Sequence, residues 1–242
     1  MRRLGARPNL SAKVRRLLAL KTNLIVQALD PKSTAETIYS SSRKAKWFSE
    51  ITGHLKSMSG VASRCMFCSG SEASNVEHFW PKSLFPQMAM TWANFFWACG
   101  ICNQAKGDTL PNGANSANLL TTLIDPTADN VWDFCFIDEY GNLTARWNTN
   151  RNSIDPRADA TIKAFRLDRE LLQVSRQSRL ADLKEKATDS LALLMAGQLT
   201  VENVRERIDE WKRQPFQPDV ADFFLAGPGS SESPFSDLLA RV

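Results

Sequence analysis

The feature that most constrains this chain is a set of four cysteines in two matched pairs, Cys65-Met66-Phe67-Cys68 and Cys99-Gly100-Ile101-Cys102. A C-x-x-C turn places two thiolates on one side of a tight loop, and two such turns supply the tetrahedral sulfur cage that zinc prefers. Four cysteine ligands close the coordination sphere, so the spacing predicts a structural zinc ion that helps this segment to fold. A redox role for one pair is an alternative, but it leaves the other pair unexplained. The fifth cysteine, Cys135, stands in an aromatic run and is expected to be a buried core thiol.

Length and composition describe a folded protein rather than a disordered one. The chain has 242 residues, of which 43% are hydrophobic, enough for one large domain or for one domain with appended helices. No apolar run approaches the roughly 20 residues that a membrane-spanning helix requires. The leucine-rich amino-terminal stretch is interrupted by Lys21, Asn23 and Gln27, which argues against a signal peptide. We therefore expect a cytoplasmic protein without a membrane segment.

Charge is unevenly distributed along the chain, although the net charge is only +4. Residues 1–56 contain 12 Lys and Arg against three acidic residues, a net charge of +9. The remainder holds 18 basic and 23 acidic residues, a net charge of −5. A basic amino-terminal region is typical of a surface that faces phosphate groups, and a pair of solvated helices is the equally weighted alternative.

Helical periodicity is clearest in this basic region. Apolar residues recur at roughly helical spacing over 11–29, and Asp30-Pro31 is expected to end that helix. The S-x-x-E pattern from Ser33 to Glu36 resembles a capping box and predicts a second helix that ends at Gly60. The buried side of the second helix would carry Ile38, Ala45, Phe48, Leu55 and Met58.

Beyond the cysteine segment, the sequence predicts a hairpin and further helices. Residues 111–118 are polar, and 132–147 are expected to form a β-hairpin that turns at 140–142. Asp155-Pro156 is a cap and first-turn pair for a short helix. A long helix is expected over 169–196, and another between Thr200 and Pro215. The tail is expected to dock a partner or to pack as an irregular cap, on the basis of Phe216, Phe223, Phe224 and Phe235.

The candidate chemistry lies between the two cysteine pairs. Glu77-His78 is the notable pair there, and the only other histidine, His54, is expected to be a surface or packing residue. A histidine accepts a proton from water near neutral pH, and an adjacent carboxylate can hold a divalent cation. Asn94 lies before the second cysteine pair, and Asn103 directly follows it at the start of an expected helix. A strand, a loop and a helix would bring His78, Asn94 and Asn103 together.

The order C-x-x-C, E-H-F-x-P-K, W-x-N and C-x-x-C-N-x-x-K resembles the ββα-metal fold of HNH endonucleases. The resemblance implies that His78 is the general base and that Glu77 and Asn103 hold a catalytic Mg²⁺ or Mn²⁺. It implies further that Asn94 braces the loop and that Lys106 contacts a substrate phosphate. Asp108 is expected to cap or to form an ion pair. The implied fold is α+β: a mostly helical chain around a small ββα-metal core with the four-cysteine zinc site.

A looser resemblance extends over about 35–190, through 123–126, the hairpin and 160–172. It is to the HNH subunit of bacterial Septu-type antiphage defence systems, some of which accompany retrons, and it implies an ATPase partner. The expected regions are a basic helical part (1–60), a nuclease core (61–125), a hairpin and helices (126–214) and the tail (215–242).

The expected activity is hydrolysis of phosphodiester bonds in DNA or RNA, leaving a 5′-phosphate and a 3′-hydroxyl. One alternative is a zinc-stabilised module that binds nucleic acid or protein without catalysis, and another is a stand-alone restriction endonuclease for modified DNA. Three tryptophans near the site are expected to be core residues rather than base-stacking platforms: Trp80, Trp92 and Trp97.

Overall fold

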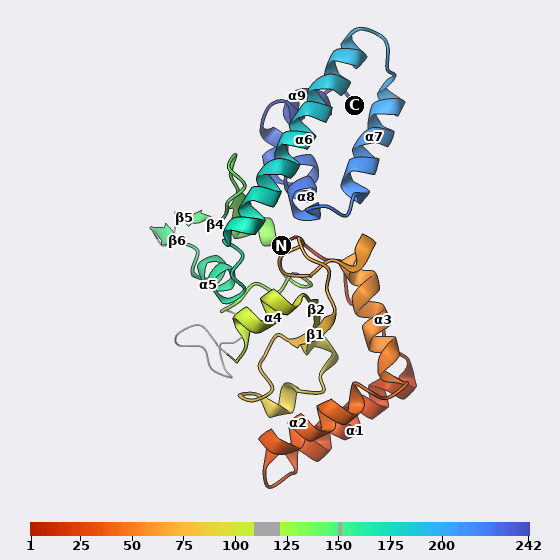
Figure 1. The fold of residues 1–242 in the computed structure, drawn as a ribbon, viewed down its shortest axis with the longest axis vertical. Helices are drawn as coiled ribbons and strands as arrows, with labels where there is room; N and C mark the ends of the chain where they lie inside the picture. Colours follow the sequence, from red (N-terminus) through yellow and green to blue (C-terminus); the bar gives the residue numbers. More distant parts are fainter. Residues whose placement is uncertain (109–121, 150–151) are drawn as a thin grey trace.

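The computed structural model describes residues 1–108, 122–149 and 152–242, so the polar segment 111–118 lies outside the described residues. Within those ranges the chain is mostly helical, with small antiparallel strand pairs, and its class is α+β as expected (Figure 1). The helices are α1 (Ala12–Val26), α2 (Pro31–Ser42), α3 (Phe48–Ser59), α4 (Gly100–Lys106), α5 (Pro156–Ala164), α6 (Glu170–Met195), α7 (Val201–Arg213), α8 (Pro218–Ala226) and α9 (Phe235–Leu239). The strands are β1 (Asn75–His78), β2 (Phe95–Ala98), β3 (Cys135–Ile137), β4 (Leu143–Ala145), β5 (Trp147–Asn148) and β6 (Ser153–Ile154).

The second helix expected in the amino-terminal region is in fact two helices, α2 and α3, separated by 43–47. Tight turns break the helix there: the Lys44 amide donates to the Ser41 carbonyl, and the Phe48 amide donates to the Ala45 carbonyl. The break lets α2 pack on α1 while α3 packs on β2. Gly60, at a φ of +82°, ends α3 as the sequence indicated.

The predicted capping box from Ser33 to Glu36 is wrong. Helix α2 begins earlier, at Pro31, and its N-cap is Asp30, whose side chain accepts a hydrogen bond of 3.1 Å from the Ser33 amide. Proline is well suited to the first helical position because its missing N–H would have no partner there. Glu36 is therefore a residue of the second turn, with its side chain free to face a neighbouring segment.

The middle of the molecule holds the segment that carries the cysteine pairs. Strands β1 and β2 are antiparallel, with Asn75 opposite Ala98 and His78 opposite Phe95. All four residues of β2 are buried, which fits its continuous apolar sequence. Helix α4 follows β2 after one residue, so the expected strand, loop and helix occur in the expected order (Figure 1).

The carboxy-terminal half is a helical unit built around α6. The predicted hairpin is confirmed as β3 and β4, whose turn contains Gly141 at a φ of +81°. The caps Asp155 and Thr200 open α5 and α7 as expected. A further pair, β5 with β6, has only two residues in each strand and was not expected.

The tail, 215–242, is largely folded rather than an open docking segment. It forms α8 and α9, which pack on α6, and α8 also packs on α7. Phe223, Phe224 and Phe235 are buried in the core of the chain itself, and Phe216 is exposed. Asp219 of α8 is also fully buried, where Arg176 of α6 donates to it at 3.1 Å. The structure therefore favours the packing alternative for this region.

None of the helices in the described ranges has both the length and the apolar character needed to cross a membrane. Cys135, the cysteine outside the two pairs, is buried, and burial raises the pKa of its thiol to about 12. Its expected role as a core residue is confirmed.

Candidate functional site

The four cysteines of the two pairs form one buried cluster. All four sulfur atoms lie within 4.8 Å of one another, and the sulfurs of Cys68 and Cys99 are 3.8 Å apart. Four ligands at the usual Zn–S distance stand about 3.8 Å from each other, as the edges of a tetrahedron. These side chains can therefore hold one metal ion, as the sequence indicated.

Residues distant in the sequence cover this cysteine cluster. The rings of Phe67 and Phe165 stack with their centroids 3.8 Å apart. The Arg169 side chain, at the start of α6, lies with its Nη1 3.8 Å from the sulfur of Cys102. A guanidinium group offsets the negative charge that several thiolates bring together. The sequence did not single out Phe165 and Arg169 as neighbours of the cluster.

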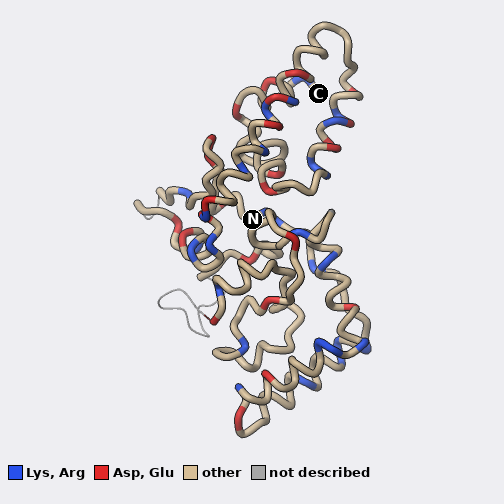
Figure 2. The backbone as a smooth tube through the Cα atoms, in the orientation of Figure 1, with Lys and Arg blue, Asp and Glu red and all other residues tan. Residues whose placement is uncertain are grey.

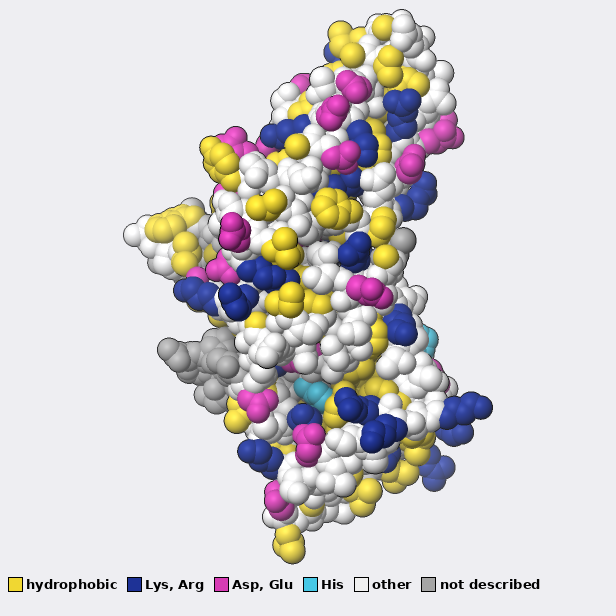
Figure 3. All heavy atoms as spheres, in the orientation of Figure 1, with side chains coloured by type: hydrophobic (Ala, Val, Ile, Leu, Met, Phe, Trp, Pro, Cys, Tyr) yellow, Lys and Arg dark blue, Asp and Glu magenta, His cyan; other side chains and the backbone are white. Residues whose placement is uncertain are grey.

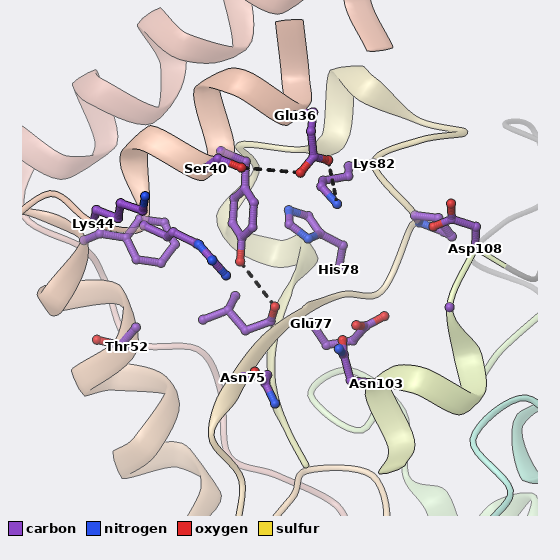
Figure 4. Close-up of a pocket in the computed structure, with 16 residues that line it drawn as sticks. Glu36, Ser40, Lys44, Thr52, Asn75, Glu77, His78, Lys82, Asn103 and Asp108 are labelled. Atoms are coloured by element: carbon purple, nitrogen blue, oxygen red, sulfur yellow. Dashed lines mark hydrogen bonds and ion pairs between the residues drawn. The ribbon is translucent and has the colours of Figure 1, made fainter. Parts of the chain in front are cut away.

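A cavity of about 650 Å³ lies beside β1, between α2, α3 and α4. The space-filling view shows a histidine at the base of a hollow, with basic side chains at its edge (Figure 3). The close-up shows that these side chains come from both the amino-terminal helices and the cysteine segment (Figure 4). The lining residues are Glu36, Tyr39, Ser40, Arg43, Lys44, Phe48, Thr52, Asn75, Val76, Glu77, His78, Pro81, Lys82, Asn103, Gly107 and Asp108.

His78 is held in one orientation at this cavity, with only 6% of the residue exposed. Its Nε2 lies 3.0 Å from the Ala89 carbonyl, which can only accept, so Nε2 carries the hydrogen and Nδ1 keeps the lone pair. Tyr39 and Phe95 pack edge-on against the ring, with centroids 4.4 and 5.3 Å away. Burial lowers the pKa of His78 from 6.5 to about 4. The imidazole is therefore neutral at pH 7 and able to accept a proton.

Glu77 lines the same cavity but is paired inside the protein with Lys106. The Lys106 Nζ donates to Glu77 Oε1 at 2.7 Å and also to the carbonyls of His78 at 2.7 Å and Gly107 at 3.3 Å. Burial raises the pKa of Glu77, and the charge of Lys106 opposes that rise. The ion pair fixes one carboxylate oxygen and joins the last turn of α4 to β1.

The prediction that Lys106 contacts a substrate phosphate does not fit this arrangement. The residue is completely buried, and its ammonium group already has three acceptors. An ammonium group has three N–H donors, so no donor remains for a phosphate. The position of Lys106 is instead that of a residue which orients Glu77.

The two asparagines occupy different places. Asn94 is fully buried and braces the loop after β1: its Oδ1 accepts from the Trp80 amide at 2.7 Å, and its Nδ2 donates to the carbonyls of Trp80 and Met88. Asn103, in α4, lines the cavity near Glu77 (Figure 4). Asp108 lines the cavity as well. Asn94 therefore shapes the loop, while Asn103 has access to whatever enters the cavity.

Helix α2 supplies a wall of the cavity that sequence reasoning did not assign to the site. Tyr39 joins this wall to the strand, because its hydroxyl donates to the Val76 carbonyl at 3.3 Å. Arg43 and Lys44 lie in the turn that follows this helix, and both line the cavity. Lys82 was visible in the E-H-F-x-P-K pattern and yet was given no role. For Arg43 and Lys44, the only sequence feature that pointed to the site was the net positive charge of residues 1–56.

Basic residues predominate in the amino-terminal region, whereas α6 and α7 carry residues of both signs (Figure 2). The tryptophans near the site are chiefly core residues: Trp80 and Trp97 are buried, and Trp92 packs partly buried against the core.

Compared with models of known protein families, the chain matches none, and no curated protein matches it.

Proposed function

We propose that the chain is a metal-dependent endonuclease of the HNH type that hydrolyses phosphodiester bonds of DNA or RNA. The observation that carries this proposal is that Glu77, His78 and Asn103 line one cavity beside a four-cysteine cluster. In this proposal β1, β2 and α4 are the ββα unit of the nuclease. The excess of basic residues in 1–56, which lies before and in α1 and in the turn 43–47, supplies affinity for the nucleic-acid backbone that does not depend on sequence.

Two metal ions have separate roles in this proposal. Zinc bound by the four cysteines is structural, because four sulfur ligands leave no position for substrate. The cavity has hard oxygen donors of the kind that Mg²⁺ and Mn²⁺ prefer, the Glu77 carboxylate and the Asn103 amide. A divalent ion held there would neutralise charge on the phosphate during hydrolysis.

The protein residues have defined tasks in the reaction. His78 Nδ1 takes a proton from the attacking water, while the Ala89 carbonyl fixes the ring through Nε2. A phosphate anion that enters the cavity stabilises the imidazolium and raises the pKa of His78 from its low value in the free protein. Lys106 orients Glu77, and Asn94 holds the loop that contributes Pro81 and Lys82 to the cavity.

The test is cleavage of single- and double-stranded DNA and RNA by the wild-type protein and by His78→Ala, with magnesium or with EDTA. His54→Ala, which removes the other histidine, is the matched control. We expect cleavage by the wild type and the control only with magnesium, and loss of at least about 100-fold in His78→Ala. Equal cleavage by His78→Ala rules out the assignment of the base. Binding without cleavage under every condition instead supports a zinc-stabilised binding module.

The proposal includes the wider setting that the sequence resemblance implies, a nuclease effector of a bacterial antiphage defence complex with an ATPase partner. If an ATPase is encoded beside this chain, co-expression of the two, followed by size-exclusion chromatography and cleavage assays, tests this part separately. Activity that appears only in the complex supports the defence setting. Cleavage of modified DNA by the isolated chain supports a stand-alone restriction enzyme.

A further inference from the structure

Lys82 is a cation of the cavity that the proposed chemistry does not yet use. It lies in the loop after β1, four residues beyond His78, and its side chain is 27% exposed. Lys82 and His78 line the same cavity and lie close together in the close-up (Figure 4). Lys106, in contrast, is completely buried, and its ammonium group donates to three acceptors inside the protein.

The surroundings of Lys82 place its charge within reach of the reactive groups. Its Nζ lies 5.8 Å from the centre of the Tyr39 ring, the ring that also packs against His78. Arg43 and Lys44, in the turn after α2, also line the cavity and add to its basic charge.

Within the ranges that the structure describes, Lys82 forms an ion pair with Glu36 of α2, with 3.0 Å between Nζ and Oε2. The Glu36 side chain is 60% exposed, and exposed ion pairs contribute little to stability because water and salt screen them. A phosphodiester group carries the same negative charge and presents similar oxygen acceptors. It can therefore replace Glu36 as the partner of Lys82 at small cost.

We propose that Lys82 binds a phosphate of the nucleic-acid substrate beside His78, and that Glu36 is a resident anion which this phosphate displaces. The inference rests on the proposed function and names the phosphate-binding residue of the same site. It assigns to Lys82 the contact that the sequence resemblance had placed on Lys106.

The proposal predicts that substitutions of Lys82 and Glu36 change nucleic-acid binding in opposite directions. Binding of a fluorescent single-stranded oligonucleotide, DNA or RNA, is measured by anisotropy in the zinc-loaded His78→Ala protein across a series of salt concentrations. We expect Lys82→Ala to weaken binding about tenfold and to reduce the salt slope by about 0.7. We expect Glu36→Gln to strengthen binding about two- to fivefold, because it frees Lys82 and removes a competing anion.

An exposed pair elsewhere provides matched controls. Lys163 and Asp159 form an i,i+4 ion pair of 2.8 Å on α5, and neither residue lines the cavity. Lys163→Ala and Asp159→Asn change the net charge by the same amounts, so they should leave binding within about twofold of the parent. If Lys82→Ala binds like Lys163→Ala, or if Glu36→Gln weakens binding as much as Lys82→Ala does, the pair is merely structural and the proposal is wrong.

This binding measurement and the cleavage assay of the wild type together separate the inference from the proposed function. If the wild type cuts nucleic acid and Lys82→Ala leaves binding unchanged, only the role of Lys82 is lost. If the wild type neither cuts nor binds nucleic acid, the proposed function fails and the inference fails with it.

Discussion

Because His78 is buried in its neutral form, we expect the protein to lose stability in acid, and the size of this loss can be worked out from the structure. The ordinary pKa of histidine is 6.5, and burial lowers that of His78 to about 4. Between these two values the unfolded chain binds more protons than the folded protein, so the free energy of unfolding falls as the pH falls. The pKa difference of about 2.5 corresponds to about 3 kcal/mol once the pH is below 4. Between pH 7 and pH 5 the loss is about 2 kcal/mol.

The assay is urea denaturation of the zinc-loaded protein at pH 7, 6 and 5, comparing the wild type with His78→Gln and His54→Gln. Protonation of cysteine ligands also destabilises the protein in acid, but this contribution is common to all three proteins and cancels in the comparison. We expect His78→Gln to lose about 2 kcal/mol less than the wild type between pH 7 and pH 5, and His54→Gln to follow the wild type. Parallel pH profiles for the wild type and His78→Gln would show that His78 is not buried as a neutral base.

Three other predictions concern the parts that support the site. Metal analysis should find about one zinc per chain, and Cys102→Ser should unfold the protein, as measured by circular dichroism; a folded, zinc-free protein contradicts the structural role. Lys106→Met should lower the free energy of unfolding by about 3–5 kcal/mol because it leaves the buried Glu77 unpaired. Adding Glu77→Gln should recover part of that loss in urea denaturation, and no recovery means that the pair is not coupled. Gly141→Ala should cost about 3 kcal/mol or more, since the new Cβ would clash with the Gln173 carbonyl oxygen of α6 and stand 2.6 Å from the Gln177 backbone nitrogen, at a φ of +81°. Gly197→Ala, at a φ of +71° with open space around it, should cost only about 1 kcal/mol; equal losses exclude the clash.

Local patterns predicted the parts of the molecule whose causes are local. The spacing of the cysteines predicted a cluster that the structure forms, and the caps Asp155 and Thr200 correctly marked the starts of two helices. The break at 43–47 was missed, because its short turns do not interrupt the apolar spacing and serve to direct α2 and α3 onto different neighbours. The cap of α2 was misplaced because Ser33 matched a pattern, while Asp30 and Pro31 made the stronger start.

At the candidate site, the sequence patterns did not predict which side chains are buried or which distant segments come together. A pattern places Lys106 near Glu77, but only packing shows that it is completely buried and so points inward. The wall formed by Tyr39, Arg43 and Lys44 comes from a segment that precedes the cysteine pairs, and its approach to His78 depends on the angle between helices. The phenylalanines of the tail were compatible with either docking or self-packing, and burial distinguished the two.

The Phe67–Phe165 stack and the contact between Arg169 and Cys102 have a consequence for protein synthesis. The amino-terminal helices α1 to α3 emerge from the ribosome first, the cysteine pairs follow, and Phe165 and Arg169, which cover the cysteine cluster, emerge about 60 residues after the second pair. A nascent chain that stops before Phe165 contains every proposed catalytic group but lacks the cover of its metal-binding scaffold. The proposed nuclease would therefore complete its site only after most of the chain has been made, which delays exposure of the host's own nucleic acid to it.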